Sequence, residues 1–262
     1  MTNETVILEK NDKIATVILN RPNSNNAIDL NLVKGLYEAF KDCHHDSKIR
    51  SIIFTGNGSM FSAGGDLLLF KENSDNLGLL VTDMTTYFHL AVTLMQRMEK
   101  PIVTAINGTA AGGGLSLALC GDIIVSSDQA KFSCAYTAAG LSPDGSMTYV
   151  LPRLIGLKKT KELMITNRRF LPDEALNIGM IDQVVEHEEL MKVSTEIAMN
   201  LADGATKAYG AVKSLLAETY SSTLESHLEQ EARLLNLRAQ SHDGKEGVKA
   251  FIEKRKPNFK GN

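Results

Sequence analysis

The 262-residue sequence predicts an α/β fold that ends in a region made of helices alone. Short apolar runs, glycine-rich loops and helical segments alternate through the first two hundred residues, which is the order that α/β layering produces. From Glu188 onward only helical periodicity remains. We therefore divide the chain into a core over residues 1–201 and a helical region over residues 202–262, with a soft boundary at Ala202–Gly204.

Strands are predicted where short runs of apolar and β-branched residues stand between turn residues. The run Ser51–Thr55 is almost wholly apolar, as in a strand that is buried on both faces. The predicted strands are Val6–Lys10, Ile14–Asn20, Ser51–Thr55, Ile102–Ile106, Asp122–Ser126, Phe132–Ala135 and Ile181–Val185.

Helices are predicted from apolar residues at helical spacing. Asp29 is the expected N-cap of a helix that runs to Cys43. A second helix runs from Leu77 to Met98, and the polar stretch from Gly65 to Asn76 before it is expected to be a mobile loop. The other predicted helical segments are Gly113–Leu119, Met147–Asn167, Leu171–Met180, Leu190–Leu201, Lys207–Tyr220, Thr223–Gln240 and Gly244–Arg255.

Composition excludes several classes of protein. With 43% hydrophobic and 23% charged residues the chain is typical of globular proteins, and its net charge of −3 offers no field for nucleic acid. Its three scattered cysteines favour reduced thiols over disulfides or a metal site. The N-terminus lacks the basic and apolar segments of a secretion signal. The uncharged stretch Pro101–Gly121 is too rich in glycine and polar residues for a membrane span, so we expect a cytoplasmic protein.

Two glycine-rich loops carry the functional signal. The first is Phe61–Leu67 and the second is Asn107–Leu115, and each follows a predicted buried strand. Glycine lets main-chain N–H groups approach a ligand closely, and such groups suit an anion or a developing oxyanion. Neither loop has the spacing of a phosphate loop, a dinucleotide fingerprint or a serine nucleophile elbow. From these residues alone, close packing of strand against helix remains the other interpretation.

The two loops together resemble those of the enoyl-CoA hydratase/isomerase (crotonase) superfamily. The resemblance continues along essentially the whole chain, at Leu19–Pro22, Asn26–Ala27, Ala130–Phe132, Gly140–Gly145, Leu151–Arg153, Ala175–Met180 and Phe251–Arg255. It implies a crotonase-like spiral of ββα turns with a C-terminal helical region, assembled as trimers or dimers of trimers. It also implies an acyl-CoA thioester as substrate, with coenzyme A as part of that substrate and no separate cofactor.

The resemblance also assigns roles to residues. The main-chain N–H groups of Gly65 and Gly113 would form an oxyanion hole for the thioester oxygen. The residues implied along the adenine and pantetheine path of CoA are Ala27, Ala63, Asp66 and Leu67. Tyr136 and His89 are further candidates for contact with the substrate. Phe251 and Lys254 fall where a tail, often from a neighbouring subunit, meets CoA.

The reaction depends on which carboxylates are present. The two glutamates of the family's hydratases correspond here to Ser116 and Tyr136, so a two-glutamate hydratase is disfavoured. Asp144 matches the position where the family's Δ3,Δ2-enoyl-CoA isomerases carry a single catalytic carboxylate. One carboxylate suffices for a 1,3-proton shift, so the resemblance favours an isomerase. From the residues alone, Pro143–Gly145 is more typical of a β-turn than of a catalytic site.

Two alternatives stay open. The superfamily's 4-chlorobenzoyl-CoA dehalogenases have a histidine at the position of His89 and an aspartate at that of Asp144, and Leu163–Arg168 also resembles that branch. Gly65 and Tyr136 depart from it, because the dehalogenases carry an aromatic residue and a tryptophan there. By itself, His89 is typical of a packed structural histidine. The third possibility is a catalytically silent acyl-CoA-binding protein.

Overall fold

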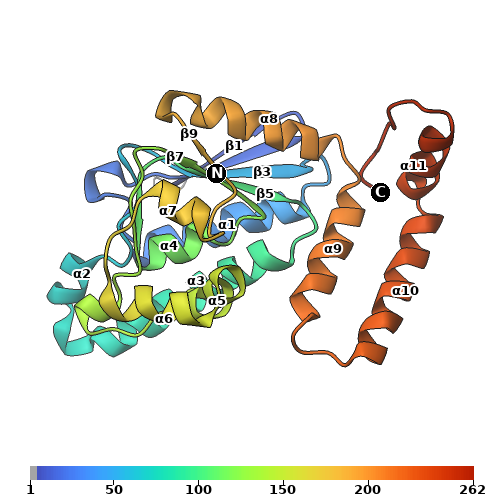
Figure 1. Cartoon of the computed structure of the whole chain (residues 1–262). Coiled ribbons are helices and arrows are strands. Elements are labelled where there is room, and N and C mark those ends of the chain that lie inside the picture. Colours follow the sequence, from blue (N-terminus) through green and yellow to red (C-terminus); the bar gives the residue numbers. More distant parts are fainter. Residues whose placement is uncertain (1–4) are drawn as a thin grey trace.

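Two sheets lie at the centre of the structure, which is a computed structural model describing residues 5–262 (Figure 1). The larger sheet has the strand order β1-β2-β3-β5-β7-β9, and the smaller has the order β4-β6-β8. Only β1 and β2 pair antiparallel among the described strands. The strands are β1 Val6–Asn11, β2 Ile14–Leu19, β3 Ser51–Gly56, β4 Met60–Ser62, β5 Ile102–Ile106, β6 Thr109–Ala111, β7 Ile123–Ser127, β8 Phe132–Ser133 and β9 Gln183–Val185.

Strands follow one another in pairs that divide between the two sheets. β3, β5 and β7 each join the larger sheet, and the strand after each of them (β4, β6 and β8) joins the smaller one. Helices follow each of these three pairs and lead back to the next strand of the larger sheet, β5, β7 or β9. This succession is the predicted spiral of ββα turns, so the fold class is confirmed. β4 and β6 overlap the two glycine-rich loops, where no strand was expected.

Helices cover both faces of the larger sheet (Figure 1). On one face, Ile53, Val103 and Val125 pack against Leu190 and Ala198 of α8. The helices α1 and α3 and the smaller sheet lie on the other side. The helices are α1 Leu30–His45, α2 Leu67–Glu72, α3 Leu77–Arg97, α4 Gly113–Ala118, α5 Met147–Ile155, α6 Leu157–Thr166, α7 Pro172–Asn177, α8 Leu190–Ala202, α9 Thr206–Glu218, α10 Leu224–Gln240 and α11 His242–Ile252.

The helices α1 and α3 form as their sequences predict. The carboxylate of Asp29 accepts a hydrogen bond from Leu32 N, so Asp29 is the N-cap of α1. The apolar residues of α1, including Val33, Leu36 and Phe40, lie in the core. α3 packs along α1 through Met84, Phe88 and other apolar residues of one face.

One expectation about local structure needs correction. The stretch from Gly65 to Asn76 was expected to be a loop, but its residues Leu67–Glu72 form α2, which Asp66 caps by accepting from Leu69 N at 3.2 Å. A short 3-10 turn, Ser74–Asn76, then leads into α3. The helices expected over Met147–Asn167 are confirmed as two, α5 and α6, and the chain turns between them at Gly156, where φ is +77°.

One described segment, Ser74–Arg97, is long and apolar enough to cross a membrane by length and composition. One face of this segment is buried, where Met84, Phe88, Ala91, Val92 and Met95 pack in the core, and Val81, Met84, Thr85 and Phe88 line a pocket. The uncharged stretch Pro101–Gly121 instead forms β5, β6 and α4, whose residues are almost all buried. Residues 1–4, on which part of the expectation about a secretion signal rests, lie outside the described residues.

The last three helices stand apart from the sheets as an arm (Figure 1). The C-terminal tail runs back from this arm to the core. There Arg50 donates to the carbonyl oxygen of Phe259 at 2.9 Å and to Thr206 Oγ1 at 3.1 Å. The buried carboxylate of Asp243 accepts from the main-chain N–H groups of Lys260 and Gly261, both at 2.7 Å. These bonds fix the arm relative to the core.

Candidate active site

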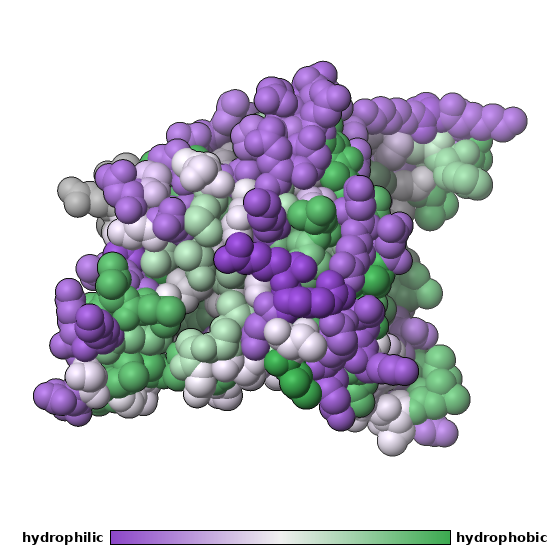
Figure 2. Space-filling view, turned by 60° about the vertical axis from the view of Figure 1, so that its left-hand side comes forward, coloured by the Kyte–Doolittle hydropathy of each residue, from purple (hydrophilic) through white to green (hydrophobic). Residues whose placement is uncertain are grey.

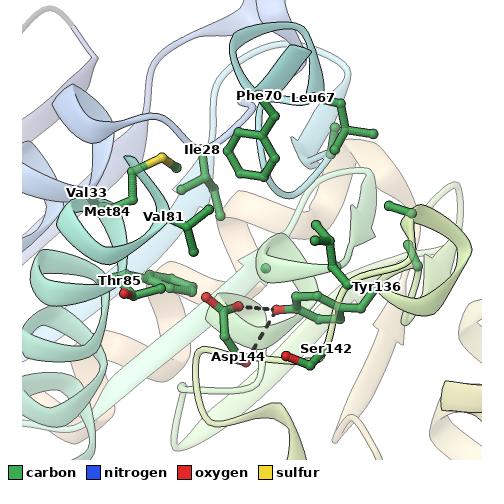
Figure 3. A pocket seen from close by; sticks show the side chains of 18 residues that line it. Ile28, Val33, Leu67, Phe70, Val81, Met84, Thr85, Tyr136, Ser142 and Asp144 are labelled. Carbon is green, nitrogen blue, oxygen red and sulfur yellow. Dashed lines mark hydrogen bonds between the residues drawn. The ribbon is translucent and has the colours of Figure 1, made fainter. Parts of the chain in front are cut away.

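A cavity of about 280 Å³ opens between α2, α3 and the two glycine-rich loops. Asp144 is the only charged side chain among the residues that line it (Figure 3). The lining residues are Ile28, Val33, Ala63, Gly65, Leu67, Phe70, Val81, Met84, Thr85, Phe88, Gly112, Gly113, Ala135, Tyr136, Ala139, Leu141, Ser142 and Asp144. The pocket is therefore largely apolar, with one carboxylate that can move a proton.

The two glycine-rich loops meet at the wall of this pocket. A Cβ atom on Gly64, where φ is +90°, would lie 2.7 Å from the carbonyl oxygen of Ala111 and 3.3 Å from Gly113 N. Only glycine allows this approach. Within residues 5–262, the N–H groups of Gly65 and Gly113 donate no hydrogen bond. Two unpaired main-chain donors thus line a largely apolar cavity, as an oxyanion hole requires.

A tight turn places Asp144 in the pocket. Gly145 follows with φ +57°, and a Cβ atom there would lie 2.5 Å from the ring of Phe88 on α3. The N–H of Gly145 donates to Nε2 of His89 at 3.4 Å, which connects the turn to the same helix. His89 is otherwise exposed and does not line the pocket. It therefore contacts the turn that carries Asp144 rather than the cavity itself.

Tyr136 and Ser116 contact Asp144 from the other side. The hydroxyl of Tyr136 donates to Oδ1 of Asp144 at 2.7 Å (Figure 3). Ser116 Oγ lies 2.8 Å from the Tyr136 hydroxyl oxygen and donates to the carbonyl oxygen of Asp144 at 3.0 Å. Three polar side chains thus form one hydrogen-bonded group at the base of the cavity.

Burial governs the acidity of this group. It raises the pKa of Asp144, and the hydrogen bond from Tyr136 and the proximity of His89 oppose that rise. Burial, together with the charge of Asp144, raises the pKa of the Tyr136 phenol far above neutral. Tyr136 therefore stays protonated and is a donor rather than a base, whereas Asp144 can exchange a proton with a substrate.

The residues implied for CoA lie at the pocket and its rim. Ala63 and Leu67 line the cavity, and Ala27 is buried beside it in the chain that leads to Ile28. Asp66 caps α2 and pairs with Arg21 Nη2 at 3.1 Å. Arg21 also donates to the carbonyl oxygen of Ala27. Arg21 thus connects the segment after β2 to the start of α2 at the rim of the pocket.

The tail residues lie elsewhere. Phe251 is 86% exposed at the end of α11, and Lys254 follows it, also exposed. Neither lines the pocket of its own chain, and α11 lies apart from the sheets (Figure 1). Within one chain, the structure therefore does not bring these two residues to the other site residues.

Reasoning from the sequence did not identify the residues that form the apolar part of the pocket. On α3, Val81, Met84, Thr85 and Phe88 face the cavity together. Their spacing of i, i+3, i+4 and i+7 was the available signal, but the same spacing also describes a face packed in the core. Arg21 was noted only as part of a motif, and its contacts to Asp66 and Ala27 come from the structure.

Exposed leucines lie on the helices that line the cavity, namely Leu67 and Leu68 on α2 and Leu79 on α3. Figure 2, which brings the α2 side of the molecule forward, shows hydrophobic surface among hydrophilic side chains on this face. Apolar side chains are therefore exposed on both helices that line the cavity.

Comparison with known proteins agrees with this geometry. The model of the enoyl-CoA hydratase/isomerase family matches residues 9–262. The chain is 34% identical to 1,2-epoxyphenylacetyl-CoA isomerase of Escherichia coli strain K12 over 251 residues, which is 95% of each protein. It is also 34% identical to 4-chlorobenzoyl coenzyme A dehalogenase-2 of an Arthrobacter species, over 87% of this chain and 83% of that protein.

Solved structures give the same result. The crystal structure of an enoyl-CoA hydratase from Polaromonas sp. JS666 superposes with a TM-score of 0.92 at 27% identity, over 97% of this chain and 99% of that one. The names of these similar proteins cover an isomerase, a dehalogenase and a hydratase, so similarity assigns the family and not the reaction. The chain belongs to the enoyl-CoA hydratase/isomerase family and is an acyl-CoA enzyme.

Proposed function

We propose that this enzyme moves the double bond of an enoyl-CoA from the Δ3 to the Δ2 position, with Asp144 as the acid/base. One observation carries the proposal: a single carboxylate lines the pocket wall that also holds two unpaired main-chain amides, those of Gly65 and Gly113. That is the minimum set for removing and returning a proton next to a thioester.

The reaction follows from this geometry. The Asp144 carboxylate removes a proton from C2 of the acyl group, and the electron pair delocalises onto the thioester oxygen and across C3 and C4. The amides of Gly65 and Gly113 stabilise that oxygen as it gains negative charge, which is worth several kcal/mol in a dry pocket. Asp144 then returns the proton at C4, leaving the double bond between C2 and C3. No water is consumed.

Hydration is disfavoured because it needs a second proton-transferring group to activate water. At the two positions that resemble the glutamates of hydratases, this chain has Ser116 and Tyr136. Ser116 is 1% exposed, and the pKa of Tyr136 is raised by its burial. Neither can act as a general base near neutral pH.

A second candidate is aryl-CoA chemistry, in which Asp144 attacks a ring carbon and chloride leaves. Two observations favour it: the 34% identity to a 4-chlorobenzoyl-CoA dehalogenase, and the contact of His89 with the turn that carries Asp144. In this reaction the carboxylate forms a covalent ester instead of carrying a proton. The two candidates therefore predict different products from the same side chain.

Self-association is part of the proposal. The arm exposes large apolar side chains, among them Leu216, Leu228, Leu235 and Phe251. Exposed apolar groups of this extent are typical of surfaces that become buried in an assembly. In a trimer or a dimer of trimers, the arm of one subunit would bring Lys254 to the CoA of its neighbour, where a cation suits the phosphates.

The test is to incubate the purified protein separately with trans-3-hexenoyl-CoA, crotonyl-CoA and 4-chlorobenzoyl-CoA. We expect conversion of the first to the 2-enoyl thioester, with hydration of crotonyl-CoA at least 100-fold slower. Chloride release from the third, without isomerisation of the first, would replace the proposal by the aryl-CoA candidate. Binding of all three with no turnover would identify a silent acyl-CoA-binding protein.

A further inference from the structure

The carboxylate of Asp144, the proposed proton carrier, is held by the side chain of Tyr136. Oδ1 of Asp144 accepts from the hydroxyl of Tyr136 at 2.7 Å, and no other described side chain donates to this carboxylate. The second carboxylate oxygen points away from Tyr136 (Figure 3). Ser116 Oγ, 2.8 Å from the Tyr136 oxygen, fixes the phenol in turn. The two oxygens of Asp144 are therefore in different environments.

We propose that Tyr136 is a positioning residue for Asp144: its hydroxyl occupies Oδ1, so that Oδ2 alone takes the proton from C2 and returns it at C4. This inference rests on the proposed isomerisation for its catalytic consequence. The geometric part, one oxygen tethered and one open, does not depend on the reaction.

Positioning is needed because an aspartate carboxylate rotates easily. Rotation about χ2 is broad and two-fold, so a free carboxylate presents either oxygen in many orientations. The Asp144 carboxylate must reach C2 and then C4 of the same substrate. Both proton transfers are faster if the plane of the carboxylate is fixed in the right orientation. The hydrogen bond from Tyr136 supplies that plane, and Ser116 keeps the phenol from turning.

The same hydrogen bond also affects the charge of Asp144. A donor stabilises the carboxylate more than the neutral acid, so Tyr136 lowers the pKa of Asp144 against the effect of burial. The phenol remains protonated, because its own pKa is raised by burial. The other titratable groups next to this cluster are His89 on α3 and two cysteines, Cys120 after α4 and Cys134 before Tyr136. The variants below leave all three unchanged.

The decisive variant is Tyr136→Phe, which removes one hydroxyl and keeps the ring. We expect the Asp144 pKa to rise, and the acid limb of the kcat profile to move to higher pH by about one pH unit. The pKa is measured by 13C NMR on protein labelled at aspartate carboxyls, with the Asp144 signal assigned by its absence in Asp144→Asn. The matched control is Tyr87→Phe, which removes a hydroxyl from a tyrosine of α3 outside the pocket lining and should move neither quantity.

Ser116→Ala is the second variant, and it answers the same question if Tyr136→Phe does not fold. Loss of the Ser116 hydroxyl loosens the phenol, so we expect the acid limb to move in the same direction by a smaller amount. An unchanged Asp144 pKa in a folded variant, with only a lower melting temperature, would overturn the inference and leave Tyr136 with a structural role. Since the NMR titration needs no turnover, absence of isomerisation in the wild type would contradict the proposed function alone.

Discussion

Arg21 and Asp66 form an ion pair, with Nη2 of the arginine 3.1 Å from Oδ2 of the aspartate. The same guanidinium lies 3.3 Å from Oδ2 of Asp29, the N-cap of α1, and all three side chains are less than one fifth exposed. One arginine thus joins the N-terminal caps of α1 and α2 at the rim of the pocket.

Arg21→Met is therefore expected to lower the free energy of unfolding by about 2 kcal/mol, between the values typical of exposed and buried pairs. The loss arises because two partly buried carboxylates remain without their counter-charge. We also expect weaker CoA binding with kcat changed less than KM. Urea unfolding and calorimetric titration with CoA measure both effects. Arg169→Met, at an exposed arginine, is the control, and equal stability of the two variants would contradict the assigned role.

The turn after Asp144 offers a matched pair of glycines. Gly145 and Gly140 both have positive φ, +57° and +71°, but only Gly145 would place a Cβ against another group, 2.5 Å from Phe88. Alanine at Gly140 should cost about 1 kcal/mol of unfolding free energy from backbone strain alone. Gly145→Ala should cost at least about twice as much and lower kcat at least 10-fold, because the turn must move Asp144. Similar stability and activity in the two variants would refute this explanation of the turn.

Stability should depend on pH through Asp144. Because burial raises its pKa above the ordinary value of 3.8, the folded protein binds this proton more tightly than the unfolded chain. Between 3.8 and the raised value, stability therefore falls as pH rises. Asp144→Asn should be more stable than the wild type at pH 7, and this advantage should shrink as the pH is lowered toward 4.

Urea unfolding of both proteins at several pH values between 4 and 7 tests this dependence. Asp75→Asn, at an exposed aspartate before α3, is the control and should show no such advantage. A variant at Asp144 that is less stable than the wild type at pH 7 would mean that the ionised carboxylate is stabilised by its surroundings, contrary to the burial described above.

The proposed assembly predicts an effect of the tail on CoA binding. Lys254→Ala should weaken CoA binding about 10-fold through loss of a cation near the phosphates. The same change at Lys249, on the preceding turns of α11, should have little effect. Isothermal titration at low and moderate salt measures the difference. If the protein is monomeric in sedimentation analysis, or if both variants bind CoA like the wild type, the tail has no part in the site.

The long elements of the fold were predictable because each has a local cause. α1 has an N-cap and apolar residues at helical spacing, and β3 and β5 are apolar runs between turn residues. β4 and β6 were missed because each has three residues, too few to establish an alternating pattern. They are strands because each pairs with a neighbour that is distant in sequence.

The parts of the site that have a local cause in the sequence were also predictable. The glycine-rich loops and Asp144 stand out in the sequence, whereas the Phe88 ring that makes Gly145 necessary lies on another helix. The bond between Tyr136 and Asp144 depends on how the chain turns between them, through a 3-10 turn that ends at Gly140. α2 had a visible signal, an aspartate before a run of leucines, but the polar residues after that run masked it.

The most direct test of the account is Asp144→Asn assayed with trans-3-hexenoyl-CoA. We predict that kcat for double-bond migration falls at least about 1000-fold, while the dissociation constant for CoA stays within about twofold of the wild-type value. In deuterated water, the wild type alone should exchange the C2 proton of the substrate. An Asp144→Asn enzyme that isomerises at the wild-type rate would contradict the central claim that this carboxylate carries the proton.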